Sequence, residues 1–385
     1  MGFTELSVIC AIGLLGPLLA LPRAWHLPVV LGELVAGAAL GKTGFGYLHS
    51  SDPTFTFLGD VGFALVMFVA GTHVPVRDPK IRPALAKGAV RAVAVGVVAG
   101  ALGYALAGIF GIGHGPLYAV LTASSSAAII LPIIDSLSLS GGGILGLLPQ
   151  VAIADAACIV ALPLAIDPPH AARAALGAVA VIAAAAAVFF ALRHFERSGA
   201  RERVHQVSEA RAFAFELRIQ LAILFGIAAV AVQTHVSIML AGFAFGLVVA
   251  AVGEPRRLAK QLFAVTEGFL GPVYFVWLGA ELNLRELFSH PRMIGLALGL
   301  TIAAVIAHAS MRLLGQAVPY GMLAAAQLGV PVSAATIGSQ LHLLKPGEGS
   351  ALMLAAMLTI GIAVAGGSIL ASGSSRPVKA VPSGA

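Results

Sequence analysis

Long apolar segments follow one another along almost the whole chain, separated by short polar loops. A helix needs roughly 20 apolar residues to cross the hydrocarbon core of a membrane, and about thirteen segments approach that length. The predicted spans are 5–22, 28–42, 57–76, 84–110, 115–135, 143–166, 171–192, 214–232, 235–252, 262–281, 293–316, 318–341 and 350–372. The pattern predicts an all-α polytopic membrane protein whose transmembrane helices form one domain, residues 1–372.

Composition favours a lipid environment over an aqueous one. Hydrophobic residues make up 59% of the chain and charged residues only 10%, whereas a soluble domain carries about 25% charged residues. The net charge is +6, but the basic residues lie in loops between apolar segments, where they set topology rather than bind nucleic acid. Their distribution predicts an external N-terminus and a cytoplasmic C-terminus. The polar tail, 373–385, is predicted to be disordered in the cytoplasm.

Parts of the first half of the chain recur in the same order in the second half. The matching pairs are PVVLGELVAG (28–37) with SIMLAGFAFG (237–246), FLGDVGFALVMFVAG (57–71) with FLGPVYFVWLGAEL (269–282) and, more weakly, TASSS (122–126) with GVPVS (329–333). We therefore expect two repeats, about 5–166 and 214–372, joined by a connector helix, 171–192. Because the connector is a single span, the second repeat enters the membrane from the opposite side, and such inverted repeats are typical of transporters.

Two of the predicted spans contain residues that interrupt a helix near its middle. The fifth span carries Thr122-Ala-Ser-Ser-Ser126, and the twelfth carries Gly329-Val-Pro331-Val-Ser333. Backbone groups freed by an interruption inside a membrane must line a cavity or be satisfied by protein. Because the two runs occupy matching repeat positions, we predict crossed discontinuous helices there. Ordinary packing of small residues between helices is the alternative.

Asp155 lies deeper in an apolar segment than any other carboxylate, at the midpoint of 143–166. An acidic side chain there costs roughly 2.5–3.5 kcal/mol to insert. It could cap a broken helix, or it could be a titratable site that holds a cation and a proton in turn. Burial favours the protonated carboxyl and a bound cation favours the carboxylate, which suits exchange. Because hard cations prefer oxygen ligands, we expect Thr122, Ser124 and Ser125 to help Asp155 bind Na⁺ or K⁺.

A few other polar residues lie within the predicted spans and could support this site. Glu33 lies near the cytoplasmic start of the second span, and Ser333 lies in the twelfth. Arg312 either pairs with a midplane carboxylate or reaches the cytoplasmic interface. His308, one turn earlier, is either a second titratable group or a hydrogen-bonded core residue. Asp60 lies near a predicted helix start, where a carboxylate suits the helix dipole.

Motifs of enzymes are absent from the sequence. The chain contains no Walker A run, HExxH or CxxC, and its two cysteines, Cys10 and Cys158, lie inside apolar segments. The sequence therefore predicts a transporter driven by ion gradients rather than an enzyme. No cofactor is expected beyond the transported Na⁺ or K⁺ and H⁺.

Four stretches together resemble the motifs of one transporter family. They are LPVVLGELVAGAALG (27–41), FLGDVGFALVMFVAG (57–71), FLGPVYFVWLGAELNLREL (269–287) and the segment around Asp155. On these stretches the chain resembles the cation:proton antiporter superfamily, specifically its second branch of bacterial Na⁺/H⁺ and K⁺/H⁺ exchangers. The resemblance implies a homodimer in the bacterial inner membrane. It also implies an elevator-like movement of a core domain, binding of cation and proton by Asp155, and pairing of Arg312 with the site.

The ion-binding segment departs from the pattern of that family. Members carry Asp-Asp or Asn-Asp where this chain has Ala154-Asp155. A single carboxylate predicts electroneutral exchange of one monovalent cation for one proton. Two alternatives stay open at this point: a Na⁺-coupled symporter of an organic anion, and a membrane sensor or binding protein that lost transport with the change to Ala154.

Overall fold

The computed structural model describes residues 1–21, 29–72, 82–198, 214–234, 236–253 and 256–374, and within these ranges the regular structure is helical. The first half contains α1 (Phe3–Gly13), α2 (Leu15–Ala20), α3 (Val29–Leu40), α4 (Pro53–Thr72), α5 (Arg82–Phe110), α6 (Gly115–Ala123), α7 (Ala127–Ser136), α8 (Gly142–Ile166), the short η1 (Pro168–His170) and α9 (Ala171–Arg197). The second half contains α11 (Phe215–Gln233), α12 (Ile238–Val252), α13 (Arg256–Val265), η2 (Thr266–Leu270), α14 (Gly271–Glu281), α15 (Leu284–Ser289), α16 (Pro291–Ala309), η3 (Ser310–Leu314), α17 (Val318–Ala324), α18 (Gly329–Gln340) and α19 (Glu348–Ser374).

The helices match the predicted membrane spans in order. Among the described residues, 11 helical stretches are long and apolar enough to cross a membrane, and α3 and α12 are shorter apolar helices. These correspond one by one to the predicted spans, which confirms the all-α polytopic fold class. Helix α19 continues to Ser374, into the predicted tail 373–385, and the remaining residues of that tail lie outside the described ranges.

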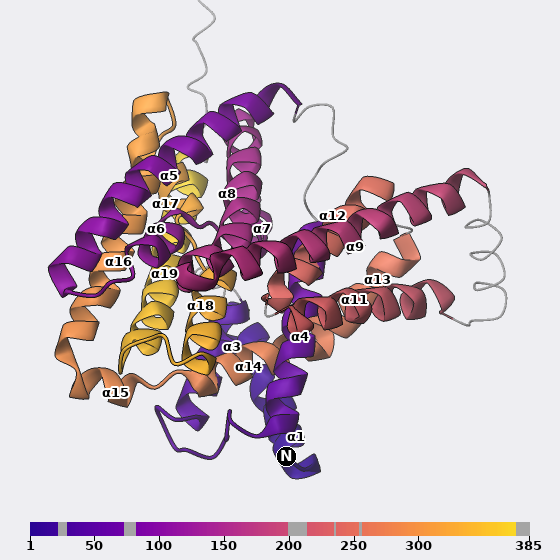
Figure 1. The fold of residues 1–385 in the computed structure, drawn as a ribbon, viewed down its shortest axis with the longest axis horizontal. Coiled ribbons are helices and arrows are strands. Elements are labelled where there is room, and N and C mark those ends of the chain that lie inside the picture. Colours follow the sequence, from indigo (N-terminus) through magenta and orange to yellow (C-terminus); the bar gives the residue numbers. More distant parts are fainter. Residues whose placement is uncertain (22–28, 73–81, 199–213, 235, 254–255, 375–385) are drawn as a thin grey trace, which may run out of the picture.

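The helices form two bundles (Figure 1). In the first, α5 packs on α6 and α8, α16 packs on α5, α6 and α19, and α17 and α18 pack on α19. In the second, α3 packs on α14, and α4 packs on α12 and α14. Helix α9 connects the halves of the chain, contacting α8 of the first bundle and α11 and α12 beside the second. The two interrupted spans, α6–α7 and α17–α18, therefore belong to the first bundle.

Glycines let the second bundle pack backbone to backbone. A Cβ atom at Gly37 of α3 would collide with the carbonyl oxygen of Val276 in α14, and one at Gly246 of α12 would collide with that of Phe68 in α4. Gly37 and Gly246 are matching positions of the two sequence repeats. Because lipid gives helices no hydrophobic reason to associate, such close contacts supply much of the attraction between them. Helix α3 pairs with α14 and α4 with α12, so each pair joins segments of the two predicted repeats, and their inverted topology stays a prediction.

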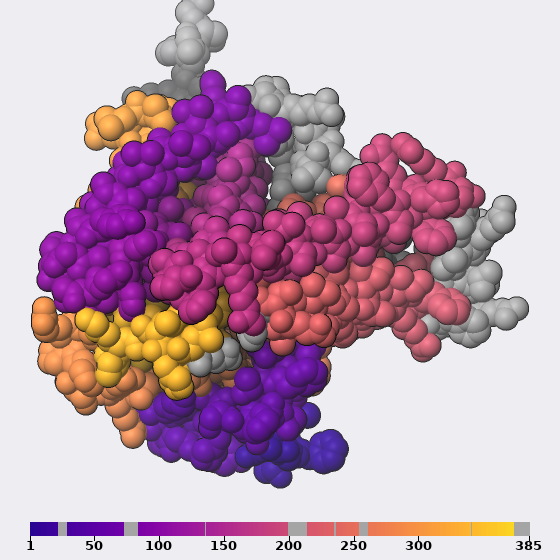
Figure 2. Space-filling view, in the orientation of Figure 1, coloured from indigo at the N-terminus to yellow at the C-terminus, as the bar shows by residue number. Residues whose placement is uncertain are grey.

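The outer surfaces of α5 and α9 are apolar. Large exposed side chains include Val93 and Val97 on α5 and Leu176 and Val179 on α9. Both helices lie on the face of the molecule seen in Figure 2. Many exposed apolar side chains of this kind would promote aggregation in water, but they suit contact with lipid.

The glycine contacts make a stability prediction. Gly246→Ala places a methyl group against the α4 backbone, and overpacking of this kind costs about 1–3 kcal/mol. The matched control is Gly226→Ala in α11, where a Cβ atom would meet nothing within 4 Å. We expect Gly246→Ala to lower the melting temperature of the purified protein in detergent, and Gly226→Ala to leave it unchanged or raise it. Equal melting temperatures for the two variants would contradict the packing described here.

Candidate functional site

The two interrupted spans meet at their interruptions. Residues 124–126 separate α6 from α7, and residues 325–328 separate α17 from α18. The Ser125 hydroxyl donates a hydrogen bond of 2.7 Å to the carbonyl oxygen of Ala324, the last residue of α17. The predicted crossing of discontinuous helices is therefore confirmed.

Local chemistry explains why the helices stop at these positions. Ser124 is in an extended conformation, and its hydroxyl donates back to the carbonyl oxygen of Leu121, because serine side chains compete with the backbone for helical partners. In the twelfth span, Pro331 lies in the first turn of α18. A proline is tolerated there, since the first N–H groups of a helix have no partner within it. The serine run therefore separates α6 from α7, whereas the run from Gly329 begins α18 directly after the interruption at 325–328.

Asp155 of α8 faces the interruption between α6 and α7. Its side chain is buried, with 6% of the residue surface exposed. The carboxylate oxygen Oδ2 accepts a hydrogen bond of 3.1 Å from the backbone N–H of Ala127, the first residue of α7. Ala127 is the one hydrogen-bond donor to this carboxylate within the described ranges. The positive end of the α7 dipole therefore faces the negative charge. The contact suggested by the capping interpretation exists, and it holds the carboxylate at the interruption.

The three predicted hydroxyl ligands lie in α6 or directly after it, and all are buried. The protons of Ser124 and Ser125 are engaged with Leu121 and Ala324. The Thr122 hydroxyl has no partner in the described part of the chain. A hydroxyl that donates one bond keeps its lone pairs, so the oxygens of all three residues retain acceptor capacity.

His308, rather than Arg312, reaches the interruption. His308 of α16 is fully buried, and its Nε2 lies 3.2 Å from the carbonyl oxygen of Ser124. Its Nδ1 is buried without a partner among the described residues. Arg312 lies beyond the end of α16, in η3, and is exposed. No described carboxylate lies within 4 Å of its guanidinium. The expected pairing of Arg312 with the site is not seen among the described residues, and it stays a prediction.

Two other predicted support residues lie elsewhere. Glu33 is buried on α3 in the second bundle, where its Cγ packs closely against Gly16. Ser333 of α18 is also buried, and its hydroxyl lies 3.1 Å from that of Ser237, the N-cap residue of α12. Ser333 therefore links α18 to the second bundle, and no hydrogen bond among the described residues joins it to Asp155. A supporting role for Glu33 stays a prediction.

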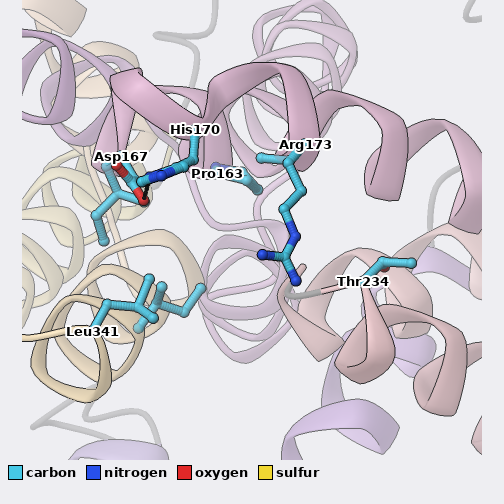
Figure 3. Close-up of a pocket in the computed structure, with 9 residues that line it drawn as sticks. Pro163, Asp167, His170, Arg173, Thr234 and Leu341 are labelled. Carbon is cyan, nitrogen blue, oxygen red and sulfur yellow. Dashed lines mark hydrogen bonds and ion pairs between the residues drawn. The ribbon is translucent and has the colours of Figure 1, made fainter.

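Cavities lie at the end of the molecule that carries α15. One of about 230 Å³ lies between the end of α8, the start of α9 and the end of α18. In Figure 3, Arg173 extends from α9 toward Thr234, and Asp167 is joined to His170 by a hydrogen bond of 2.9 Å. A second cavity of about 340 Å³ is lined by Asp60 and Ser333. In the described ranges, no cluster of three His, Cys, Asp or Glu side chains could hold a metal ion. A cation here would need a single carboxylate together with hydroxyl and carbonyl oxygens.

Together these features define a polytopic membrane protein in which a buried carboxylate faces crossed, interrupted helices. Residues 9–372 match the sodium/hydrogen exchanger transmembrane family, and the chain belongs to that family.

Individual relatives agree with this membership. The chain is 24% identical over 379 residues to YjbQ of Bacillus subtilis, which is named as a Na⁺/H⁺ antiporter. The match covers 92% of this chain and 61% of YjbQ, so the chain spans about three fifths of that relative. A protein of Methanocaldococcus jannaschii named as Na⁺/H⁺ antiporter 3 is 25% identical over 341 residues, covering 84% of this chain and 85% of the relative. The solved structure of the sodium proton antiporter MjNhaP1 from M. jannaschii at pH 8 shares the fold: its TM-score is 0.61, its identity is 14%, and the match covers 96% of this chain and 97% of that one.

The contact between the crossed helices makes a second prediction. Ser125→Ala removes the donor to a buried carbonyl, and an unsatisfied buried acceptor costs about 1–3 kcal/mol. Ser136→Ala is the matched control, because the Ser136 hydroxyl bonds only within its own helix, to Ile133. We expect Ser125→Ala to be the less stable variant in thermal denaturation in detergent. Equal destabilisation of Ser136→Ala would contradict a special contribution of the Ser125–Ala324 hydrogen bond to stability.

Proposed function

We propose that this protein is a secondary-active antiporter that exchanges Na⁺ or K⁺ for H⁺ through Asp155. The observation that carries the proposal is the buried Asp155 carboxylate at the interruption between α6 and α7, held by the N–H of Ala127. Membership of the sodium/hydrogen exchanger family and the names of the relatives support the same activity.

The coupling of cation movement to proton movement follows from the single buried negative charge. A charge in a low-dielectric site is costly unless it is neutralised, and either a proton or a monovalent cation can neutralise Asp155. The two ligands compete for the same oxygens, so binding of one releases the other. Ala127 fixes one carboxylate oxygen, and the hydroxyl of Thr122, which has no partner among the described residues, could supply a further oxygen ligand. His308 orients the end of α6 through the Ser124 carbonyl oxygen.

The stoichiometry is proposed to be one cation for one proton. The position before Asp155 is Ala154, so α8 offers no second carboxylate to carry an extra proton. With one exchangeable charge, each cycle moves a cation one way and a proton the other. Exchange is then electroneutral.

The geometry favours a cation over an organic anion as the substrate. An anion symporter of similar architecture would use the N-terminus of a half-helix to bind the substrate carboxylate. In this chain the first N–H of α7 is already taken by Asp155. A second negative group beside it would be repelled.

The molecular setting is also part of the proposal. We place the protein as a homodimer in a bacterial plasma membrane, with the N-terminus outside and the C-terminus in the cytoplasm. The family resemblance supports the dimer, and the distribution of Lys and Arg among the loops supports the orientation. Light scattering of the detergent-solubilised protein should give twice the chain mass of 39.0 kDa, and reporter fusions at the C-terminus should be active only as cytoplasmic reporters.

Loss of the buried carboxylate should abolish exchange. In proteoliposomes with a trapped pH-sensitive dye, we expect the unaltered protein to move protons when Na⁺, K⁺ or Li⁺ is added, for at least one of these ions. Asp155→Asn should reduce this signal to that of protein-free vesicles, because an amide neither ionises nor binds a proton. Asp167→Asn is the control, since Asp167 lies outside α8 and pairs with His170. Exchange that persists in Asp155→Asn would move the site elsewhere. Uptake of an organic anion without proton movement would favour symport.

Electroneutral exchange predicts insensitivity to membrane potential. With Na⁺ as the cation, a potential set by K⁺ and valinomycin should leave the initial rate unchanged. Ala154→Asp adds a second carboxylate beside the first, and we expect this variant either to respond to the potential or to be less stable. A strong voltage dependence of the unaltered protein would contradict the proposed one-for-one stoichiometry.

A further inference from the structure

Asp60 is a carboxylate inside a membrane span for which the site described above gives no role. It lies on α4 about two helical turns after Pro53, too far into the helix for the dipole of the first turn to account for it. No described residue forms an ion pair or a hydrogen bond with its carboxylate. Ionisable residues within membrane spans are costly and usually functional. Asp60 therefore needs a ligand or a water-filled space.

The space is the cavity of about 340 Å³ between the two bundles. One water occupies about 30 Å³ in the liquid, so this cavity holds several waters or a partly hydrated ion. Three hydroxyl-bearing residues line it together with Asp60: Ser237, Ser333 and Thr336. Carboxylate, hydroxyl and water oxygens are the ligands that hard cations prefer.

The wall of the cavity begins close to the crossing of the interrupted helices. Val332 and Ser333 line it, and both lie one turn into α18, which begins at Gly329 directly after the interruption at 325–328. That interruption contacts Ser125 through Ala324. An ion in this cavity is thus separated from the crossing by about one turn of α18.

Aromatic packing fixes the position of Asp60 within the wall. The indole ring of Trp277 lies against Gly59, where a Cβ atom would stand 2.9 Å from its Cδ2. The indole Nε1–H of Trp277 donates a hydrogen bond of 3.0 Å to the carbonyl oxygen of Ser50. Trp277 itself lines the cavity. The ring is therefore held one residue from Asp60 and beside the space that the carboxylate faces.

The charges of the neighbouring cavities differ. The cavity of Figure 3 carries the guanidinium of Arg173, and its acid, Asp167, is already paired with His170. A third cavity, of about 540 Å³, contains the paired Lys42 and Glu281. The Asp60 cavity, in contrast, has an unpaired carboxylate and no basic side chain among the described residues that line it.

We propose that Asp60 and its hydroxyl-lined cavity form a second binding site for a monovalent metal cation, on the path between the α15 end of the molecule and Asp155. This second site rests on the proposed antiport, and it specifies where the cation binds before it reaches Asp155. Binding there raises the local cation concentration at the crossing. The site needs no proton exchange of its own.

A transport experiment tests this role. Exchange is measured in right-side-out and in inverted membrane vesicles, with Na⁺, K⁺ or Li⁺ as the varied ion. Asp60→Asn should raise the KM for the cation about fivefold or more on the side that the α15 end faces, because the attractive charge is lost. The maximal rate should be retained, since Asp155 is intact. Asp60→Glu should restore the KM, and Asp167→Asn should leave it unchanged. An unchanged KM in Asp60→Asn on both sides overturns the second site. An inactive Asp155→Asn in the same series would still support the antiport itself.

A binding experiment decides the question without transport. The chain has two tryptophans, Trp25 and Trp277, so Trp25→Phe leaves Trp277 as the reporter beside the cavity. Tl⁺ in nitrate buffer quenches indole fluorescence as a heavy monovalent cation. We expect saturable quenching that excess K⁺ or Na⁺ reverses, and Asp60→Asn should shift the half-quenching concentration upward about fivefold or more. Quenching by neutral acrylamide should not change. Equal Tl⁺ quenching with and without the Asp60 carboxylate would overturn the proposal, whether or not the protein transports.

Discussion

Helices that stop halfway across a membrane leave backbone N–H and C=O groups with no water to bind them. In this protein, side chains and the partner helix supply the missing bonds. The hydroxyl of Ser125 satisfies the end of α17, the carboxylate of Asp155 satisfies the start of α7, and the imidazole of His308 contacts the end of α6. In the other interruption, the N–H of Gln327 donates to the hydroxyl of Thr359. These contacts satisfy backbone groups at the two interruptions, and one of them holds the Asp155 carboxylate in the interior.

The second bundle is held together by close helix packing, and cavities lie along its boundary with the first bundle. Glycines let α3 pack on α14 and α4 on α12 at backbone contact. The second bundle is therefore tightly packed. The cavities lie at the boundary between the two bundles. There the hydroxyls of Ser237 and Ser333 form a hydrogen bond from one bundle to the other. Few hydrogen bonds cross that boundary in the described ranges, which is compatible with the movement of a core domain that the family resemblance implies. Polar groups line the boundary, and apolar side chains cover the outer surface.

The sequence was sufficient for the fold because a membrane imposes simple rules on it. Apolar length marked the spans, and the Ser run at 124–126 and Pro331 marked the interruptions. Contacts between distant residues were harder to foresee. The family resemblance points to Arg312 as the partner of the site, whereas in the structure Arg312 is exposed after the end of α16 and His308 contacts the interruption. Asp60 looked like a helix-start residue because the start of α4 was placed too late in the chain. Small shifts of helix ends rotate side chains by large angles, and hydropathy does not fix those ends.

The central claim is that one buried carboxylate holds a cation and a proton in turn, and the most direct measurement is the proton released when a cation binds. The purified protein is placed in weakly buffered detergent solution, and Na⁺, K⁺ or Li⁺ is added while the pH is recorded. The account predicts release of up to one proton per chain from the unaltered protein with a transported cation, and none from Asp155→Asn. Undiminished release from Asp155→Asn, or cation binding to the unaltered protein with no release at any pH, would contradict it.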